Sequence, residues 1–174
     1  MIPHSDDYRY YPMPTPSALT TYQTPILAEW VDYNGHLRDA FYLLIFSFAT
    51  DALMDQLGLD EAGRARTGHT LYTLECHLNF LDEVKLGEAV EVHTQVLAHD
   101  RKRLHIHHSL HRVGVADALA ESEQMLMNIN VSTSRSATFD EQVMQQVHML
   151  SAAHCTLAIP ACVGRTLGLP PARA

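Results

Sequence analysis

The longest apolar stretch of the chain runs from Ala40 to Leu57 and predicts a helix. Its apolar side chains occupy nearly the whole circumference rather than one stripe, which indicates a helix that is covered on most sides. We expect it to begin near Arg38 or Asp39 and to end before Gly58, a glycine that can adopt the left-handed cap conformation. The simplest cover for such a helix within one domain is a curved sheet.

Alternation of apolar and polar residues predicts strands on both sides of this helix. A first strand is expected at Tyr22–Val31, where Pro25 favours an edge position or a bulge. After the helix, apolar and polar side chains alternate throughout Thr70–Leu81. Three more strands follow, joined by short turns, so the sequence predicts an antiparallel meander. These strands are expected at Ala89–Ala98, Arg103–Val113 and Ala118–Val131.

The segments between and beyond these elements complete an α+β domain. The polar segment Asp60–His69 is expected to be a loop, and Thr138–Glu141 has the pattern of a capping box that opens a second helix ending near Ala153. Proline-rich segments at both ends are expected to be extended. The predicted organisation is an N-terminal arm at 1–20, one domain at 21–157 and a C-terminal tail at 158–174.

Composition narrows the class of protein. The chain has 174 residues, 47% of them hydrophobic, and a formal net charge of −8, which disfavours a nucleic-acid partner. The three cysteines, Cys76, Cys155 and Cys162, form no CxxC pair and fit reduced thiols better than a disulfide framework. We find no signal peptide at the N-terminus and no apolar run long enough to span a membrane. We therefore expect a cytoplasmic protein.

The turn before the central helix carries the candidate chemistry. Asp32, Asn34 and His36 are spaced two residues apart, so an extended backbone places them on one side. The helix that follows offers unpaired N–H groups and positive potential at its N-terminus. The alternative is structural: Asp32 stabilises the turn, Gly35 supplies a positive φ, and His36 bonds to the backbone.

The order of elements, the Asp-x-x-Gly-His turn and the Gly87-Glu88 turn before a valine-rich strand resemble the hotdog fold. More narrowly, they resemble the 4-hydroxybenzoyl-CoA thioesterase family of acyl-CoA thioesterases, over roughly Thr21–Val131. The resemblance implies a long antiparallel sheet wrapped around one buried helix. It also implies hydrolysis of an acyl-CoA in a homodimer or homotetramer, with no organic cofactor.

The same resemblance assigns roles in the reaction. Asp32 matches the catalytic carboxylate and either activates water or attacks the thioester itself. Backbone N–H groups of Arg38 and Asp39 would form the oxyanion hole. Glu75 is a further candidate, because some hotdog thioesterases use a carboxylate from the partner subunit, although a solvated sheet face is the alternative. Arg38 departs from the family, since many relatives have Asn at that position.

The dense basic cluster Arg101, Lys102 and Arg103 is the candidate site for the phosphates of CoA. The alternative is a solvated hairpin turn. His105, His107 and His111 share one face of their strand and invite a metal interpretation. We favour a polar sheet face or a subunit interface, because no cysteine or carboxylate lies at ligand spacing within that cluster. The expectation is therefore that the protein needs no metal.

Four further segments narrow the resemblance within the family and imply a small acyl group with a quaternary ammonium. Such a group needs an aromatic or acidic pocket. Aromatic residues flank the turn, although aromatics beside a central helix usually belong to the core. The segments are Trp30–Leu37, Thr73–His77, Asp100–His105 and Val163–Leu169, and the aromatics are Trp30, Tyr33, Phe41 and Tyr42.

Two other functions are compatible with this fold. The first is a hotdog acyl-CoA dehydratase or hydratase, but those relatives usually show an Asp-x-Asn-x-x-His pattern, and Asp32 and His36 are one residue closer together than that. The second is a non-catalytic acyl-CoA-binding module. Activity measurements separate both from a thioesterase.

Overall fold

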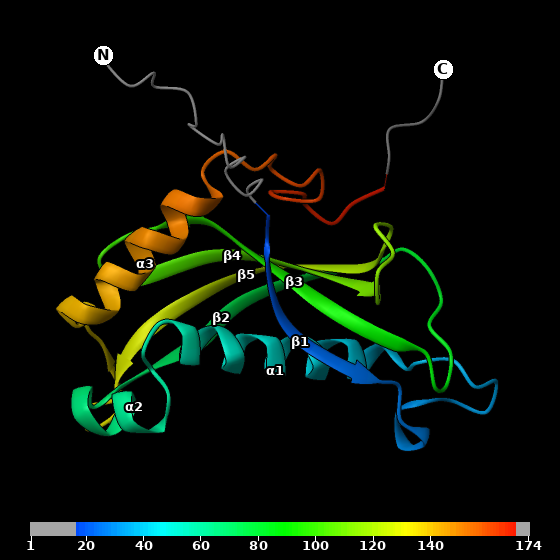
Figure 1. Ribbon diagram of the computed structural model, residues 1–174, viewed down its shortest axis with the longest axis horizontal. Coiled ribbons are helices and arrows are strands. Elements are labelled where there is room, and N and C mark those ends of the chain that lie inside the picture. Colours follow the sequence, from blue (N-terminus) through cyan, green and yellow to red (C-terminus); the bar gives the residue numbers. More distant parts are fainter. Residues whose placement is uncertain (1–16, 170–174) are drawn as a thin grey trace, which may run out of the picture.

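A six-stranded antiparallel sheet curls along one long helix (Figure 1). The computed structural model describes residues 17–169, so the predicted N-terminal arm lies almost entirely outside the described residues. The strand order is β1-β3-β4-β5-β2, with the short β6 paired to β5. The strands are β1 Leu19–Pro25, β2 His69–Phe80, β3 Ala89–His99, β4 Arg103–Arg112, β5 Ala118–Asn130 and β6 Arg135–Ser136, and the helices are η1 Ala28–Trp30, α1 Asp39–Gln56, α2 Glu61–Thr67 and α3 Glu141–His154.

Helix α1 confirms the predicted central helix and its end. Gly58 follows with φ +77°, the left-handed conformation expected of a glycine cap. The side of α1 that faces the sheet is buried through Ile45, Phe46 and Leu53, each with no exposed surface. The prediction that the helix is covered on most sides is only partly right, since Leu43 is 44% exposed. One sheet covers one side of a helix, and residues 17–169 leave part of the opposite side of α1 exposed.

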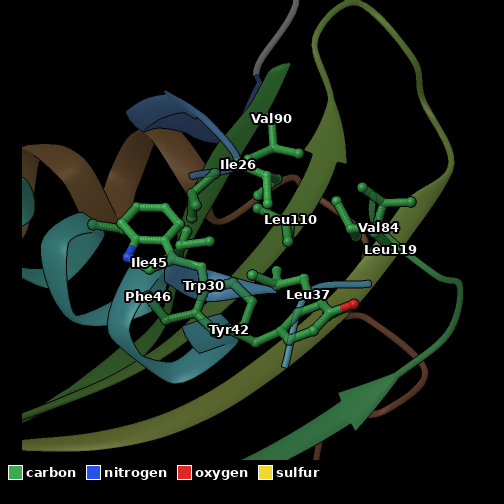
Figure 2. Packing of buried hydrophobic residues seen from close by; sticks show 13 residues of the cluster. Ile26, Trp30, Leu37, Tyr42, Ile45, Phe46, Val84, Val90, Leu110 and Leu119 are labelled. Atoms are coloured by element: carbon green, nitrogen blue, oxygen red, sulfur yellow. The ribbon is translucent and has the colours of Figure 1, made fainter. Parts of the chain in front are cut away.

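The core consists of side chains from α1 and the concave face of the sheet (Figure 2). Val90, Val92 and Leu110 from the central strands are fully buried against the first half of α1. A second cluster joins the end of α1 to Leu104, Ile106 and neighbouring apolar residues. Together they confirm the hotdog arrangement that the pattern and the resemblance predicted.

The first strand and the segment after α1 differ from the predictions. The strand is Leu19–Pro25 rather than Tyr22–Val31, because a 3-10 turn at Ala28–Trp30 interrupts the extended chain. The segment Asp60–His69 is not a loop throughout. It contains helix α2, whose N-cap Asp60 accepts a hydrogen bond from the Gly63 N–H at 2.8 Å.

Helix α3 starts later than the capping-box pattern predicted. Its N-cap is Asp140, whose carboxylate accepts the N–H of Gln142, so Thr138 lies before the helix. The helix covers the end of β3 that β1 leaves unpaired, and there the Val96 N–H donates to His154 Nδ1 at 3.0 Å. The α3 helix thus protects an open strand edge.

The described part of the C-terminal tail, Ala158–Leu169, contains a turn at 161–164 and packs on the convex face of the sheet. The Gly164 N–H donates to Glu123 Oε2 at 2.7 Å, and the Arg165 carbonyl lies 3.1 Å from His77 Nδ1. Among the described helices none is by itself long and apolar enough to cross a membrane; α1 and α2, bent by 64°, meet that test only as a pair.

Candidate active site

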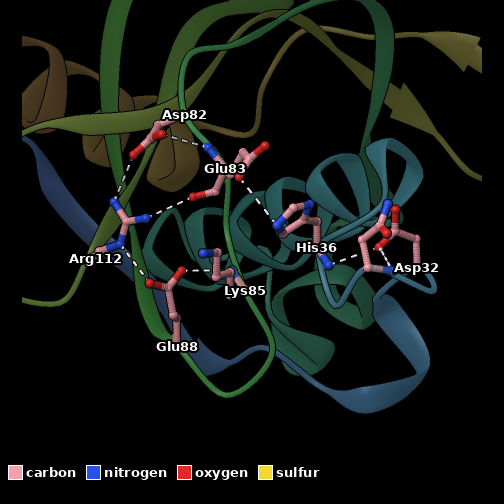
Figure 3. A network of polar contacts seen from close by, with 8 residues as sticks. Asp32, His36, Asp82, Glu83, Lys85, Glu88 and Arg112 are labelled. Atoms are coloured by element: carbon pink, nitrogen blue, oxygen red, sulfur yellow. Dashed lines mark hydrogen bonds and ion pairs between the residues drawn. The ribbon is translucent and has the colours of Figure 1, made fainter.

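The turn at Asp32–His36 is closed by hydrogen bonds at its two ends (Figure 3). Asp32 Oδ1 accepts the backbone N–H groups of Asn34 at 2.9 Å and His36 at 3.0 Å. The Asp32 N–H donates to the His36 carbonyl, and the Gly35 N–H donates to the Asp32 carbonyl. Gly35 has φ +79°, which other residues adopt only with strain. The structural roles considered for Asp32 and Gly35 are therefore both present.

These contacts leave Asp32 charged and one of its oxygens available. The hydrogen bond from the His36 backbone N–H holds the pKa of Asp32 below its usual value. The Asn34 N–H and the charge of Arg38 act in the same direction with smaller effects. Both bonds go to Oδ1, while Oδ2 has no hydrogen-bond partner among residues 17–169. An ionised carboxylate oxygen with no partner can act as a nucleophile or can orient a water.

His36 connects this turn to the loop between β2 and β3. Its Nε2 lies 3.3 Å from Glu83 Oε2, and its backbone forms a bridge with Lys85. That loop is fixed by Arg112, which bonds to Asp82 at 3.1 Å and to Glu88 at 3.0 Å (Figure 3). Neither Glu83 nor Arg112 could be found by reasoning from the sequence, because Glu83 comes from a loop far along the chain and Arg112 acts on that loop from β4.

The start of α1 offers one of the two predicted oxyanion donors. The Arg38 N–H already donates to the Trp30 carbonyl at 3.0 Å, so the prediction that this donor is unpaired is wrong. The reason is that the 3-10 turn before Asp32 brings the Trp30 carbonyl back against the start of the helix. The Asp39 N–H has no acceptor within the described chain. The Arg38 side chain is exposed, and its Nε–H donates to the Val31 carbonyl at 3.0 Å.

An open cavity of about 610 Å³ lies beside this helix start. His36 and Asp39 line it together with Tyr42 and Phe80, whose rings meet edge to face with centroids 5.1 Å apart. Burial, followed by the charge of Asp82, raises the pKa of Tyr42. The other lining residues are Leu37, Leu81, Asp82, Glu83 and Val84.

The aromatic residues near the turn divide into core and surface. Trp30 is 7% exposed and stacks on Phe41 with centroids 6.0 Å apart, and Tyr42 is 4% exposed. Tyr33 is 94% exposed and projects from the turn. Trp30 and Phe41 therefore serve mainly as core, whereas Tyr42 also reaches the cavity.

Glu75 is not brought to the Asp32 turn within one chain. It lies on the convex face of β2, 3.5 Å from His77, in a cavity that His105 and Glu123 also line. Phe80, five positions further along β2, is the residue of that strand that reaches the helix start. At ~3.3 Å per residue this separates Glu75 from the cavity at α1 by roughly 16 Å along the strand.

The basic cluster also lies far from Asp32 in the same chain. The cluster follows the C-terminal end of β3, whereas the N-terminal end of β3 lies next to the Asp32 turn. The 11 residues of β3 therefore separate the basic cluster from Asp32 by roughly 33 Å. Arg103 is bound to Asp100 by two hydrogen bonds of 2.8 and 2.6 Å, which hold the pKa of Asp100 down at about 2. Arg101 and Lys102 have no such carboxylate partner in the described structure.

The histidines of β4 lie on both faces of the strand. His105 bonds to Glu123 at 2.7 Å on the convex face, and His111 bonds to Ser109 and stacks on His93. His107 lies on that face too, next to Glu121. His108 instead points into the core and is fully buried. The face shared by 105, 107 and 111 is thus confirmed, and the adjacent strand supplies the carboxylates that the local sequence lacked.

A curled antiparallel sheet around a helix, with an ionised aspartate at the helix start, defines a hotdog protein suited to acyl transfer. The chain belongs to the thioesterase-like superfamily, whose family model matches residues 26–147. The resemblance to acyl-CoA thioesterases is confirmed.

Curated relatives narrow the assignment within the superfamily. The chain is 62% identical to the betainyl-CoA thioesterase of Pseudomonas aeruginosa over 155 residues, which are 89% of this chain and 98% of that protein. It is 35% identical over 145 residues to an L-carnitine dehydrogenase/betainyl-CoA thioesterase of Rhizobium meliloti, but those residues cover only 29% of that protein. The narrower resemblance expected from the four short segments, which is to betainyl-CoA thioesterase, is confirmed.

Solved structures agree on the fold. A thioesterase-like protein of Pseudomonas putida KT2440 is 52% identical with a TM-score of 0.77, covering 88% of this chain and 97% of that one. A hypothetical protein of Staphylococcus aureus, solved in complex with CoA, is 29% identical with a TM-score of 0.81, covering 88% and 98%.

Proposed function

We propose that this protein is an acyl-CoA thioesterase that hydrolyses betainyl-CoA to betaine and CoA. The observation that carries the proposal is the 62% identity to a betainyl-CoA thioesterase along 98% of that relative's length. The site geometry supports it, because an ionised Asp32 stands next to a helix start that offers the Asp39 N–H. A role in carnitine breakdown follows from the names of the relatives.

In the proposed reaction the thioester carbonyl lies between Asp32 and the start of α1. If Asp32 Oδ2 attacks the carbonyl carbon, the C–S bond breaks and a mixed anhydride forms, which water then hydrolyses to the free acid and the regenerated carboxylate. If Asp32 instead takes a proton from water, the resulting hydroxide attacks the carbonyl carbon and the C–S bond breaks directly. In both routes the CoA thiolate takes up a proton and leaves as the thiol. The Asp39 N–H and the positive end of the helix stabilise the oxyanion. His36, whose Nε2 lies 3.3 Å from Glu83, acts as the group that transfers a proton to the leaving thiolate. The backbone N–H of Asn34 keeps the Asp32 carboxylate in place.

We further infer a homodimer or homotetramer. Strand β2 forms one edge of the sheet and exposes Tyr72, Leu74 and Phe80 by 52–56%. Exposed apolar side chains on an edge strand favour pairing with another chain. A second copy at this edge is the arrangement that would carry Glu75, or the basic turn Arg101–Arg103, to a neighbouring Asp32. Light scattering in solution tests this, and a monomer would contradict it.

A cytoplasmic location accords with CoA thioesters as substrates and with three cysteines that are free thiols, Cys76, Cys155 and Cys162. We also propose that hydrolysis itself needs no cofactor, because carboxylate, water and backbone donors suffice for the chemistry described above.

The test is release of free thiol from a panel of betainyl, short aliphatic and aromatic acyl-CoA esters by the wild type and by Asp32→Asn. An asparagine Oδ1 still accepts the N–H groups of Asn34 and His36, so the variant keeps the turn and loses only the charge. We expect kcat on betainyl-CoA to fall by at least about 100-fold with the melting temperature unchanged. Asp32→Ala, which removes the acceptor as well, is expected to lower the melting temperature.

Four results would each refute a part of this proposal. A wild type that binds CoA esters and releases no thiol would favour the binding module, and hydration of an enoyl-CoA would favour the hydratase. An Asp32→Asn variant with full activity would remove Asp32 from the chemistry. Likewise, unchanged turnover in Glu75→Gln would remove Glu75 from the site.

A further inference from the structure

Three potential metal ligands meet on the convex face of the sheet, outside the site described above. They are His107 from β4, Glu121 from β5 and Cys162 from the C-terminal tail, and their ligand atoms all lie within 4.8 Å of one another. His107 Nε2 and Glu121 Oε1 are 3.5 Å apart. Three donors of different chemistry thus converge from three separate segments of the chain.

The His107 imidazole is buried with one poorly satisfied nitrogen. The residue is 4% exposed, and its buried Nε2 makes no well-formed hydrogen bond in the described part of the chain, although Glu121 Oε1 lies 3.5 Å away. A buried polar atom without a partner usually costs about 1–3 kcal/mol. Cys162, the third member of the cluster, is also buried, at 6% exposed. An ion between the three residues would give Nε2 a direct ligand bond in place of this long contact to Glu121.

We propose that His107, Glu121 and Cys162 bind one Zn²⁺ ion through Nε2, a carboxylate oxygen and Sγ. Nitrogen, oxygen and thiolate donors in one set are typical of zinc, and three protein ligands leave a fourth position for water. A carboxylate and a thiolate balance the charge of the ion while the imidazole stays neutral. Bonds of ~2.0–2.3 Å at tetrahedral angles place ligand atoms about 3.3–3.8 Å apart, so the cluster contracts by about 1 Å at its widest.

The site fastens the tail to the sheet. Directly after Cys162, Gly164 bonds to Glu123 and Arg165 contacts His77, and both tail residues line the cavity that contains Glu75. An ion at Cys162 therefore fixes the wall of that cavity. The proposal concerns binding of the ion and does not depend on the proposed thioesterase activity.

The competing arrangement contains no metal. In it the Cys162 thiol donates to the Glu121 carboxylate, and burial together with that carboxylate raises the pKa of Cys162 to about 12. Among the described residues this arrangement leaves His107 Nε2 with a 3.5 Å contact to Glu121 and no well-formed hydrogen bond, whereas zinc binding engages all three side chains.

The test starts with zinc affinity, measured by competition with a chromogenic chelator on untagged full-length protein. We expect the wild type to bind one zinc per chain. Cys162→Ser and Glu121→Gln should each weaken binding by at least about 100-fold. Cys155→Ser is the matched control, because Cys155 is exposed and lies outside the cluster, and it should bind zinc as the wild type does.

Two outcomes overturn the proposal: a wild type that takes up no zinc, or a Cys162→Ser variant with wild-type affinity, which would mean adventitious binding elsewhere. Should the ligand variants fail to fold, Co²⁺ is added to a protein with Cys76→Ser and Cys155→Ser, in which Cys162 is the only thiol. A thiolate-to-cobalt charge-transfer band at one equivalent supports the site, and its absence refutes it.

Discussion

Acid should destabilise this protein in part through one buried imidazole. His108 is fully buried, and its ring stacks on Phe46 with centroids 5.7 Å apart. Thr50 Oγ1 gives its hydrogen to the Phe46 carbonyl, so it accepts from His108 Nε2 at 3.0 Å. His108 Nδ1 then accepts from Thr94 Oγ1 at 2.8 Å, which in turn contacts Thr21. The contacts therefore specify a neutral ring protonated on Nε2.

The size of the acid destabilisation follows from the pKa of His108 in the unfolded chain and its pKa in the folded protein. Burial lowers the pKa of His108 from 6.5 to about 3 in the folded protein. Above pH 6.5 the ring is neutral in both states and contributes no pH dependence. Below it the unfolded chain binds a proton that the folded protein does not, so stability falls by about 1.4 kcal/mol per pH unit until pH approaches 3. Between pH 7 and pH 5 the loss amounts to about 2 kcal/mol.

Urea unfolding measures the contribution of His108 to the pH dependence of stability. The wild type and His108→Gln are compared at pH 7, 6 and 5 and at one fixed protein concentration. Glutamine does not titrate and can still bond to Thr50 and Thr94. The contributions of other titrating groups are common to both proteins and cancel in the difference. We expect the stability difference between wild type and variant to shrink by about 2 kcal/mol from pH 7 to pH 5. An equal pH dependence in both proteins would refute a buried neutral His108.

Two further predictions concern substrate affinity and packing. Lys102→Glu should raise the KM for the acyl-CoA more than it lowers kcat, because phosphate contacts far from the carbonyl bind ground and transition states alike. Steady-state kinetics measure both constants, and a fall in kcat alone would contradict this prediction. Gly63→Ala should lower the free energy of unfolding by about 1–3 kcal/mol in urea titrations, because the added Cβ would lie 1.9 Å from the Gly58 carbonyl oxygen. Gly168→Ala, where the added atom meets nothing within 4 Å, is the control and should change little.

Much of the fold could be predicted because it depends on short-range patterns. The long apolar run located α1, and Gly58 located its end. The turns before β3, β4 and β5 were recognisable from their glycine, aspartate and basic residues. Boundaries were less predictable where two signals compete. The segment after Pro25 continues an apolar pattern, but the chain leaves the sheet there to form the 3-10 turn that positions Trp30.

The parts that could not be predicted depend on contacts between distant segments. Nothing near Cys162 in the sequence indicates that the tail crosses the sheet beside His107. Glu121 lies on a neighbouring strand, so the metal interpretation based on the spacing of the β4 histidines alone considered the wrong partners. The same limit applies to Glu83, which reaches His36 from a loop far along the chain.

The Asp32 turn was predictable for a physical reason that also bears on its function. Asp32 Oδ1 accepts N–H groups from Asn34 and His36, two and four residues later, so the residues that hold the carboxylate are encoded beside it. The same two bonds lower its pKa, and because both go to Oδ1 they leave Oδ2 without a hydrogen-bond partner among the described residues. The structural role and the catalytic role therefore use different oxygens of one side chain. Asp32→Asn separates the two roles because asparagine keeps the accepting oxygen and replaces the other one.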